Sequence, residues 1–160
     1  MRPTLLAMAI LFSVVTAMAQ SEPTTAGGDL PGNTDRVDAS LRAKQNPEVK
    51  KYAKQIEAAK LDPDKALTLA SLLAKSRTKN KSSATLAFDG GTAELTPMQE
   101  LLTIASAAKQ LGLNAEEIVK ARAKGGSVAE AFKVAAKKHN QTLPDEKLSK
   151  ALHSGANSVQ

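Results

Sequence analysis

The sequence predicts an all-α fold, a small bundle of about six or seven short helices in one domain over residues 35–155. Apolar residues recur at three- and four-residue steps, which is typical of amphipathic helices. Capping residues precede these stretches and glycines follow several of them. Alanine is abundant on the apolar faces, so we expect close helix packing but modest stability. Residues 20–34, rich in Pro, Gly, Ser and Thr, predict a disordered linker, and residues 156–160 a short tail.

The first nineteen residues are typical of an export signal. Arg2 precedes an apolar run from Leu5 to Met18, and Ala17-Met18-Ala19 provides small residues at the expected cleavage positions. The run is shorter than the ~20 residues that a membrane-spanning helix needs. We therefore predict a signal peptide over residues 1–19, cleavage near Ala19, and a secreted or periplasmic mature protein without a transmembrane span.

Start signals divide the first half of the domain into three helices. The first is short, beginning at Thr34 or Asp35 and running through Gln45. Asn46, followed by Pro47 and Glu48, predicts the start of a second helix over residues 47–61. The third begins after Asp62 and is apolar around much of its circumference, so we expect it to be the central helix.

Residues 84–95 interrupt the helical pattern. Two short runs with strand-forming residues flank Asp89-Gly90-Gly91, which predicts a small β-hairpin. A two-stranded hairpin is only marginally stable in water unless it packs on helices. A loop is the alternative.

Three capping boxes and several glycines organise the second half. Each box places a capping residue three positions before Gln or Glu. Gly112 and Gly125-Gly126 stand where helix ends are expected. The last helix is predicted to begin at Pro144 and to end before Gly155. The three boxes are Thr96 with Gln99, Asn114 with Glu117, and Ser127 with Glu130.

Residues 104–124 resemble the helix-turn-helix unit of bacterial transcriptional regulators. The resemblance lies in Ala108, the turn Leu111-Gly112-Leu113, and Ile118, and it implies two helices packed at a tight turn. A regulator would place the start of the second helix on DNA, but here that position carries Glu116 and Glu117, which phosphates repel. We therefore expect the packing but no binding to DNA.

Two basic clusters are the candidate partner-binding residues. The chain has 22 Lys and Arg against 16 Asp and Glu, a net charge of +6. Clustered cations attract anionic surfaces, but cations near helix ends are also favoured by the helix dipole alone. If both clusters share one face, binding is the stronger interpretation. The clusters are Lys75, Arg77, Lys79 and Lys81, and Lys133, Lys137 and Lys138.

Composition excludes several kinds of chemistry. Without cysteine there is no disulfide, thiolate metal site or cysteine nucleophile, and two histidines cannot form a multi-histidine zinc site. With 2% aromatic residues, no stacking platform for nucleic acid is expected. Ser127 and the Asp62-Pro63-Asp64 acids are interpreted as helix caps, and His139 and His153 as surface residues near helix ends. We expect no catalytic residue, metal or cofactor.

These observations favour a non-enzymatic exported protein that binds a macromolecule, either a protein or an anionic surface, as an accessory of the periplasm or envelope. One alternative is a secreted effector that acts on a host target. Another is an enzyme, such as a hydrolase, whose site is assembled from distant positions. A third is a membrane-active protein that uses the basic helix at 47–61.

Overall fold

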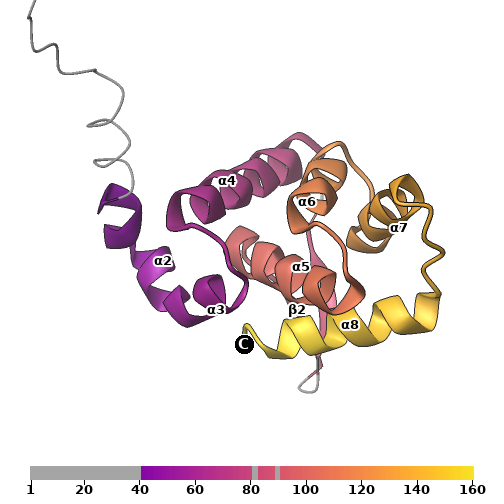
Figure 1. Ribbon diagram of the computed structural model, residues 1–160. Coiled ribbons are helices and arrows are strands. Elements are labelled where there is room, and N and C mark those ends of the chain that lie inside the picture. Colours follow the sequence, from indigo (N-terminus) through magenta and orange to yellow (C-terminus); the bar gives the residue numbers. More distant parts are fainter. Residues whose placement is uncertain (1–40, 81–82, 89–90) are drawn as a thin grey trace, which may run out of the picture. The chain divides into compact units, whose positions relative to one another are not determined.

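The structure, a computed structural model, describes residues 41–80, 83–88 and 91–160 of the chain (Figure 1). The predicted signal peptide and linker lie outside the described residues, as does the expected start of the first helix. Residues 41–45 are helical.

Helices and one small hairpin make up the described part of the chain, as the sequence predicts. The two strands pair antiparallel, with Thr85 opposite Glu94 and Leu86 opposite Ala93. The labelled elements are α2 (Pro47–Lys51), α3 (Ala53–Ala58), α4 (Pro63–Asn80), β1 (Thr85–Phe88), β2 (Gly91–Glu94), α5 (Pro97–Leu111), α6 (Ala115–Ala123), α7 (Val128–Lys138) and α8 (Asp145–Asn157).

Local capping chemistry sets most helix starts where the sequence predicts them. The Asn46 side chain accepts a hydrogen bond from the Glu48 amide, and Asp62 does the same for Asp64. Both Thr96 and Ser127 form complete capping boxes, in which the side-chain oxygen of the Gln or Glu three residues later accepts a hydrogen bond from the amide of the capping residue. Each bond satisfies an amide that the first helical turn leaves without a partner.

The helix-turn-helix packing is also present. Gly112 ends α5 with a φ of 68°, a left-handed conformation that glycine adopts without strain. The Leu113 amide donates to the Ala108 carbonyl at 2.9 Å, closing the turn. Ala108 and Ile118 are buried on the two sides of the turn.

Three details of the sequence prediction are wrong. The expected helix at 47–61 is split into α2 and α3 at Tyr52, and its apolar residues pack in the core. Asn114 caps the Glu116 amide, while the Glu117 carboxylate turns to His139 instead of completing a box. The last helix runs through Gly155 to Asn157.

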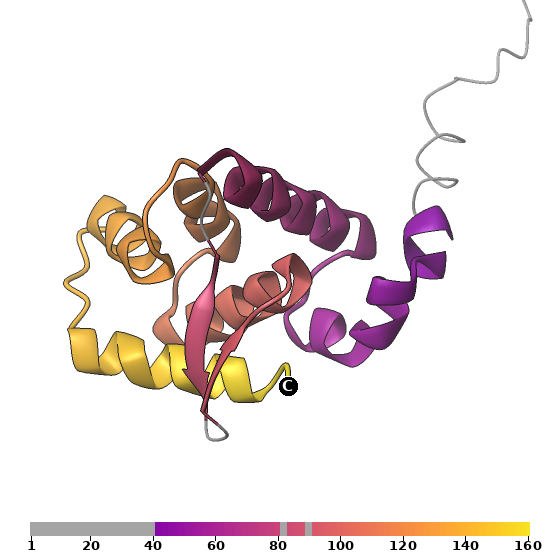
Figure 2. The same ribbon diagram turned by 180° about the vertical axis from the view of Figure 1, so that it is seen from behind.

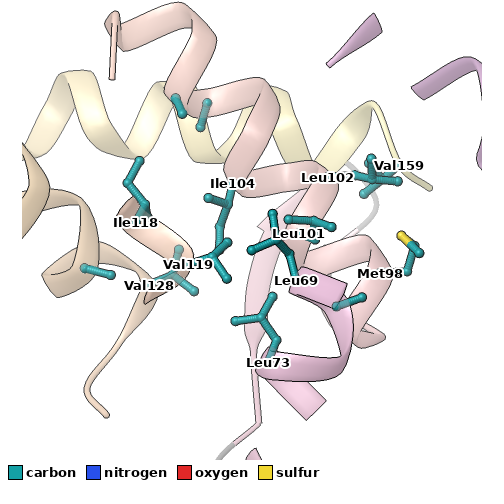
Figure 3. Packing of buried hydrophobic residues seen from close by; sticks show 14 of the residues in the cluster. Leu69, Leu73, Met98, Leu101, Leu102, Ile104, Ile118, Val119, Val128 and Val159 are labelled. Atoms are coloured by element: carbon teal, nitrogen blue, oxygen red, sulfur yellow. The ribbon is translucent and has the colours of Figure 1, made fainter. Parts of the chain in front are cut away.

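The central helix is α5, which corrects the expectation for α4. Helix α5 contacts α4, α6 and α8, and it is buried around most of its circumference (Figure 3). On α4, by contrast, Leu67, Leu72 and Ala74 are only partly buried. The central helix was predicted as the one that is apolar around most of its circumference. This criterion missed α5 because α5 buries two polar residues, Glu100 and Thr103.

The C-terminal segment belongs to the core. Gly155 faces the Thr103 carbonyl so closely that a Cβ at this position would lie 2.8 Å from that oxygen. This close approach brings α8 against α5. Ala156 and Val159, in the predicted tail, are buried. The hairpin packs beside α8 through β1, which supplies the helical support that an isolated hairpin lacks (Figure 2).

Candidate functional site

The most buried ionic contacts join three helices through the carboxylate of Glu100. Arg77 of α4 donates from Nε and Nη2 to Glu100 Oε2, at 2.9 and 2.5 Å. Arg122 of α6 donates from Nε to Oε1 at 2.9 Å. The Glu100 side chain is 0% exposed, so its partners must lie within the protein.

One further nitrogen of each arginine, Nη1, donates to a backbone carbonyl. Arg77 Nη1 donates to the Leu95 carbonyl at 2.6 Å, where the hairpin leads into α5. Arg122 Nη1 donates to the Gly126 carbonyl at 2.8 Å, in the turn before α7. The cluster therefore ties α4, α5 and α6 to two connecting segments. Its carboxylate is enclosed and hydrogen-bonded on both oxygens, so it has no access to a substrate.

The first predicted basic cluster is divided by the fold. Arg77 points inward to Glu100, and its side chain is 13% exposed. Lys75 and Lys79 of the same helix are exposed. Lys81 lies outside the described residues. Four basic residues that look equivalent in sequence thus include one structural residue and two that face solvent.

The second predicted cluster is divided as well. Lys133 pairs with Asp145 at the start of α8, at 2.6 Å. Lys137 and Lys138 are exposed, and neither forms an ion pair with another residue of the described ranges. Lys138 lies one turn beyond Val134 on α7, so the two share a face.

A hollow of about 780 Å³ lies between α4, α6 and α7. Its apolar lining comes from all three helices: Leu72 of α4, Ala121 of α6, and Val134 and Ala135 of α7. Val134 is 51% exposed, and it is one of two large hydrophobic side chains of the described residues that are exposed, the other being Leu41.

Three lysines and one glutamate supply the charges around the hollow, a net charge of +2. Lys120 pairs with Glu116 at 2.8 Å, whereas Lys124 and Lys138 form no ion pair among the described residues, although the charge of Lys138 also acts on the nearby carboxylate of Glu117. The glutamate is Glu117, and His139 Nε2 lies 2.9 Å from its Oε2 atom. The hydrogen bond from His139 is the main reason that the pKa of Glu117 is lowered.

One lysine of each predicted cluster, Lys138 and Lys79, lies on the side of the domain that carries the hollow. Lys138 lines it directly. Leu72 also lines it, and Lys79 lies two turns further along the same face of α4. A hydrogen bond joins the C-terminal parts of α4 and α6: the Ser76 hydroxyl donates to the Ala123 carbonyl at 3.1 Å. Lys79 therefore belongs to the same side of the domain as Lys124.

The acids at the start of α6 have partners within the domain. Glu116 bridges Lys120 and Lys65, which lie 2.8 and 2.5 Å from its oxygens. Hydrogen bonds from Lys120 and then Lys65 lower the pKa of Glu116 to about 2. The Lys65 pair joins α6 to α4, whereas the Lys120 pair lies within α6.

The other residues considered from the sequence have local structural contacts. Ser127 accepts a hydrogen bond from the Glu130 amide as a helix cap. Asp62 caps the start of α4. His139 pairs with Glu117, and His153 lines a separate hollow with Leu148 and Leu152.

The described residues do not bring together a metal-binding group of three or more His, Asp or Glu side chains. No helix in this part of the chain is both long and apolar enough to cross a membrane. No protein family, curated protein or solved structure matches the chain.

Sequence reasoning missed the hollow and the residues that α6 contributes to it. Lys120 and Lys124 are spaced four apart and so share a helix face, which is a usable signal. Arg122 lies between them, however, and points inward to Glu100. Val134 was missed because an isolated apolar residue on a basic helix carries no signal by itself.

Proposed function

We propose that this is an exported, non-enzymatic helical protein that binds an anionic macromolecular partner, as an accessory of the periplasm or envelope. The observation that carries the proposal is the division of the cations between two roles. Arg77 and Arg122 are satisfied inside the domain by Glu100. Five exposed lysines on or next to α4, α6 and α7 instead form no ion pair within the described ranges: Lys75, Lys79, Lys124, Lys137 and Lys138.

Unpaired lysines on adjoining surfaces create a positive potential that attracts anions and accelerates their association. A DNA partner is not proposed, because the start of α6 carries Glu116 and Glu117 where a regulator would contact DNA. Both acids are also engaged in contacts within the domain.

Binding is tested with fluorescent poly-L-glutamate as the probe, by anisotropy at low and physiological salt. We expect salt-sensitive binding by the mature protein. Replacing Lys75, Lys79 and Lys137 by Glu should weaken binding about tenfold or more, since charges that contact the ligand act at short range. The matched control replaces three exposed lysines on the first helices: Lys44→Glu, Lys50→Glu and Lys54→Glu.

The two triple variants have the same net charge, so a difference between them reports the location of binding. Equal losses would contradict the proposed surface, because binding would then depend on net charge alone. Absence of salt-sensitive binding would contradict the proposed function itself.

Export is tested separately by fractionating the producing cells into cytoplasm, envelope and medium, with intact-mass analysis of each fraction. The proposal, which draws on residues 1–19, expects protein beginning at Gln20 in the envelope. Cytoplasmic protein that retains Met1 would contradict export. Mature protein inside a neighbouring or host cell would favour the effector alternative.

A further inference from the structure

The hollow between α4, α6 and α7 combines two features that a purely electrostatic surface does not need. Its lining is apolar on all three helices, and Val134 is exposed there rather than packed. Lysines and one acid, Glu117, surround this lining. Glu117 forms its ion pair with His139, and Lys124 and Lys138 form no ion pair in the described part of the chain. A ligand that matches the hollow must therefore carry both apolar groups and negative charge.

The chemistry of the hollow distinguishes between the classes of anionic ligand. A nucleic-acid backbone would pair with the lysines but would leave Val134 and Leu72 uncovered, and no aromatic side chain lines the hollow for base stacking. A bilayer presents a broad surface, whereas this site is a concavity between helices. An amphipathic helix places apolar side chains on one face and carboxylates beside them, and it binds in such grooves.

We propose that the hollow binds an acidic amphipathic segment of a partner protein, inserting apolar side chains against Val134, Leu72 and Ala121 while its carboxylates pair with Lys124 and Lys138. The inference rests on the proposed function and names the class of partner for the same surface. It adds the requirement that binding depends on the apolar pattern of the ligand as well as on its charge.

The probe is a fluorescent peptide of about 18 residues with Leu at positions i, i+3, i+4 and i+7 and Glu at the positions that flank this apolar face. A peptide of the same composition in scrambled order keeps the charge and removes the apolar face. Binding of both peptides to the mature protein is measured by anisotropy. We expect the patterned peptide to bind at least tenfold more tightly than the scrambled peptide.

Two pairs of variants locate the site. Val134→Ser should weaken binding of the patterned peptide about fivefold or more, whereas Leu41→Ser, at the other exposed hydrophobic residue, should leave it unchanged. The double variant Lys124→Glu/Lys138→Glu should bind the patterned peptide more weakly than the double variant Lys44→Glu/Lys50→Glu. The two double variants have the same net charge. Far-UV circular dichroism establishes that each variant keeps its helical content.

Several results would overturn the inference without affecting the proposed function. These are equal binding of the two peptides, binding of poly-L-glutamate but of neither peptide, and equal effects of Val134→Ser and Leu41→Ser. Preference for phosphatidylglycerol vesicles over the patterned peptide would point to a lipid surface and would also overturn the inference. Failure of every anionic probe to bind would overturn both proposals.

Discussion

The Glu100 cluster and the lysine-lined hollow use positive charge in opposite ways. In the cluster, two arginines surround one enclosed carboxylate and also bind two backbone carbonyls, so their donors are used inside the domain. At the hollow, Lys124 and Lys138 are exposed and pair with no acid among the described residues. The two regions meet on α6, where Arg122 stands between Lys120 and Lys124.

The choice of residue follows from the chemistry of the two cations. A guanidinium group is planar and presents several donors in fixed directions, which suits one carboxylate and a nearby carbonyl. A lysine packs its carbon chain along apolar surface and keeps its ammonium group in water. Net charge alone therefore does not indicate how much of this protein's positive charge is exposed to solvent.

The largest effect is expected from removing the buried carboxylate. Glu100→Ala leaves Arg77 and Arg122 without their shared acid, and breaking a buried ion pair typically costs about 3–5 kcal/mol of unfolding free energy. The measurement is the urea unfolding midpoint. Glu146→Ala is the control, since Glu146 is 80% exposed and pairs only with Lys150. Similar losses in both variants would contradict a structural role for the cluster.

A second comparison separates two cations on the same helix. Arg77→Ala removes one of the two cations that compensate Glu100, so a loss of about 3 kcal/mol is expected. Lys79→Ala, two residues later on an exposed face, should change stability by no more than about 0.5 kcal/mol. Both are measured by urea unfolding. If Lys79→Ala were the more damaging change, the assignment of Arg77 to the interior would be wrong.

A smaller effect is expected at the turn that Arg122 holds. Ser127 caps α7 directly after Gly126, whose carbonyl accepts from Arg122. Ser127→Ala removes the capping oxygen and should cost about 1 kcal/mol by thermal or urea unfolding. Ser71→Ala, on the exposed face of α4, removes a hydroxyl without removing a cap. Equal stability of the two variants would show that the cap adds nothing to this turn.

The smallest effect concerns the surface acid that pairs with lysine. The pKa of Glu116 is about 2 in the folded protein, below its ordinary value of 4.5, because Lys120 and Lys65 bind it. A lowered folded pKa stabilises the protein above pH 4.5, and this contribution is lost as pH falls from about 4.5 to about 2.

Glu116→Gln should therefore reduce the dependence of stability on pH over this interval, and added salt should reduce the difference between variant and parent. Carboxyl NMR titration of Glu116 measures the pKa directly. A midpoint near 4.5 would show that the two lysines do not hold it.

The candidate site was only partly predictable. The sequence identified basic residues on α4 and α7 but grouped Arg77 with Lys75 and Lys79, because their spacing alone does not show which cation turns inward. Glu100 lies in the first turn of α5, and no role was assigned to it from the sequence. Its partners lie 23 and 22 residues away in the chain, on two other helices, so no local pattern connects them.

In the fold, too, features that depend on local interactions were predicted from the sequence. Helix starts at Asn46, Thr96 and Ser127, and the turn at Gly112, followed from the sequence because a cap acts within three residues of its partner. The hairpin was predicted as one of two alternatives, and its contact with α8 supplies the support that the choice required.

Local sequence signals were sufficient to predict the mostly helical fold, most of the helix starts and the excess of positive charge. The packing of the helices was needed to show that α5 is central, that α8 continues through Gly155 against Thr103, and that three helices form an apolar hollow among lysines. The difference lies in how far apart in the chain the interacting residues are. Capping and periodicity are properties of neighbouring residues, whereas burial of a carboxylate and exposure of Val134 depend on which helices pack together.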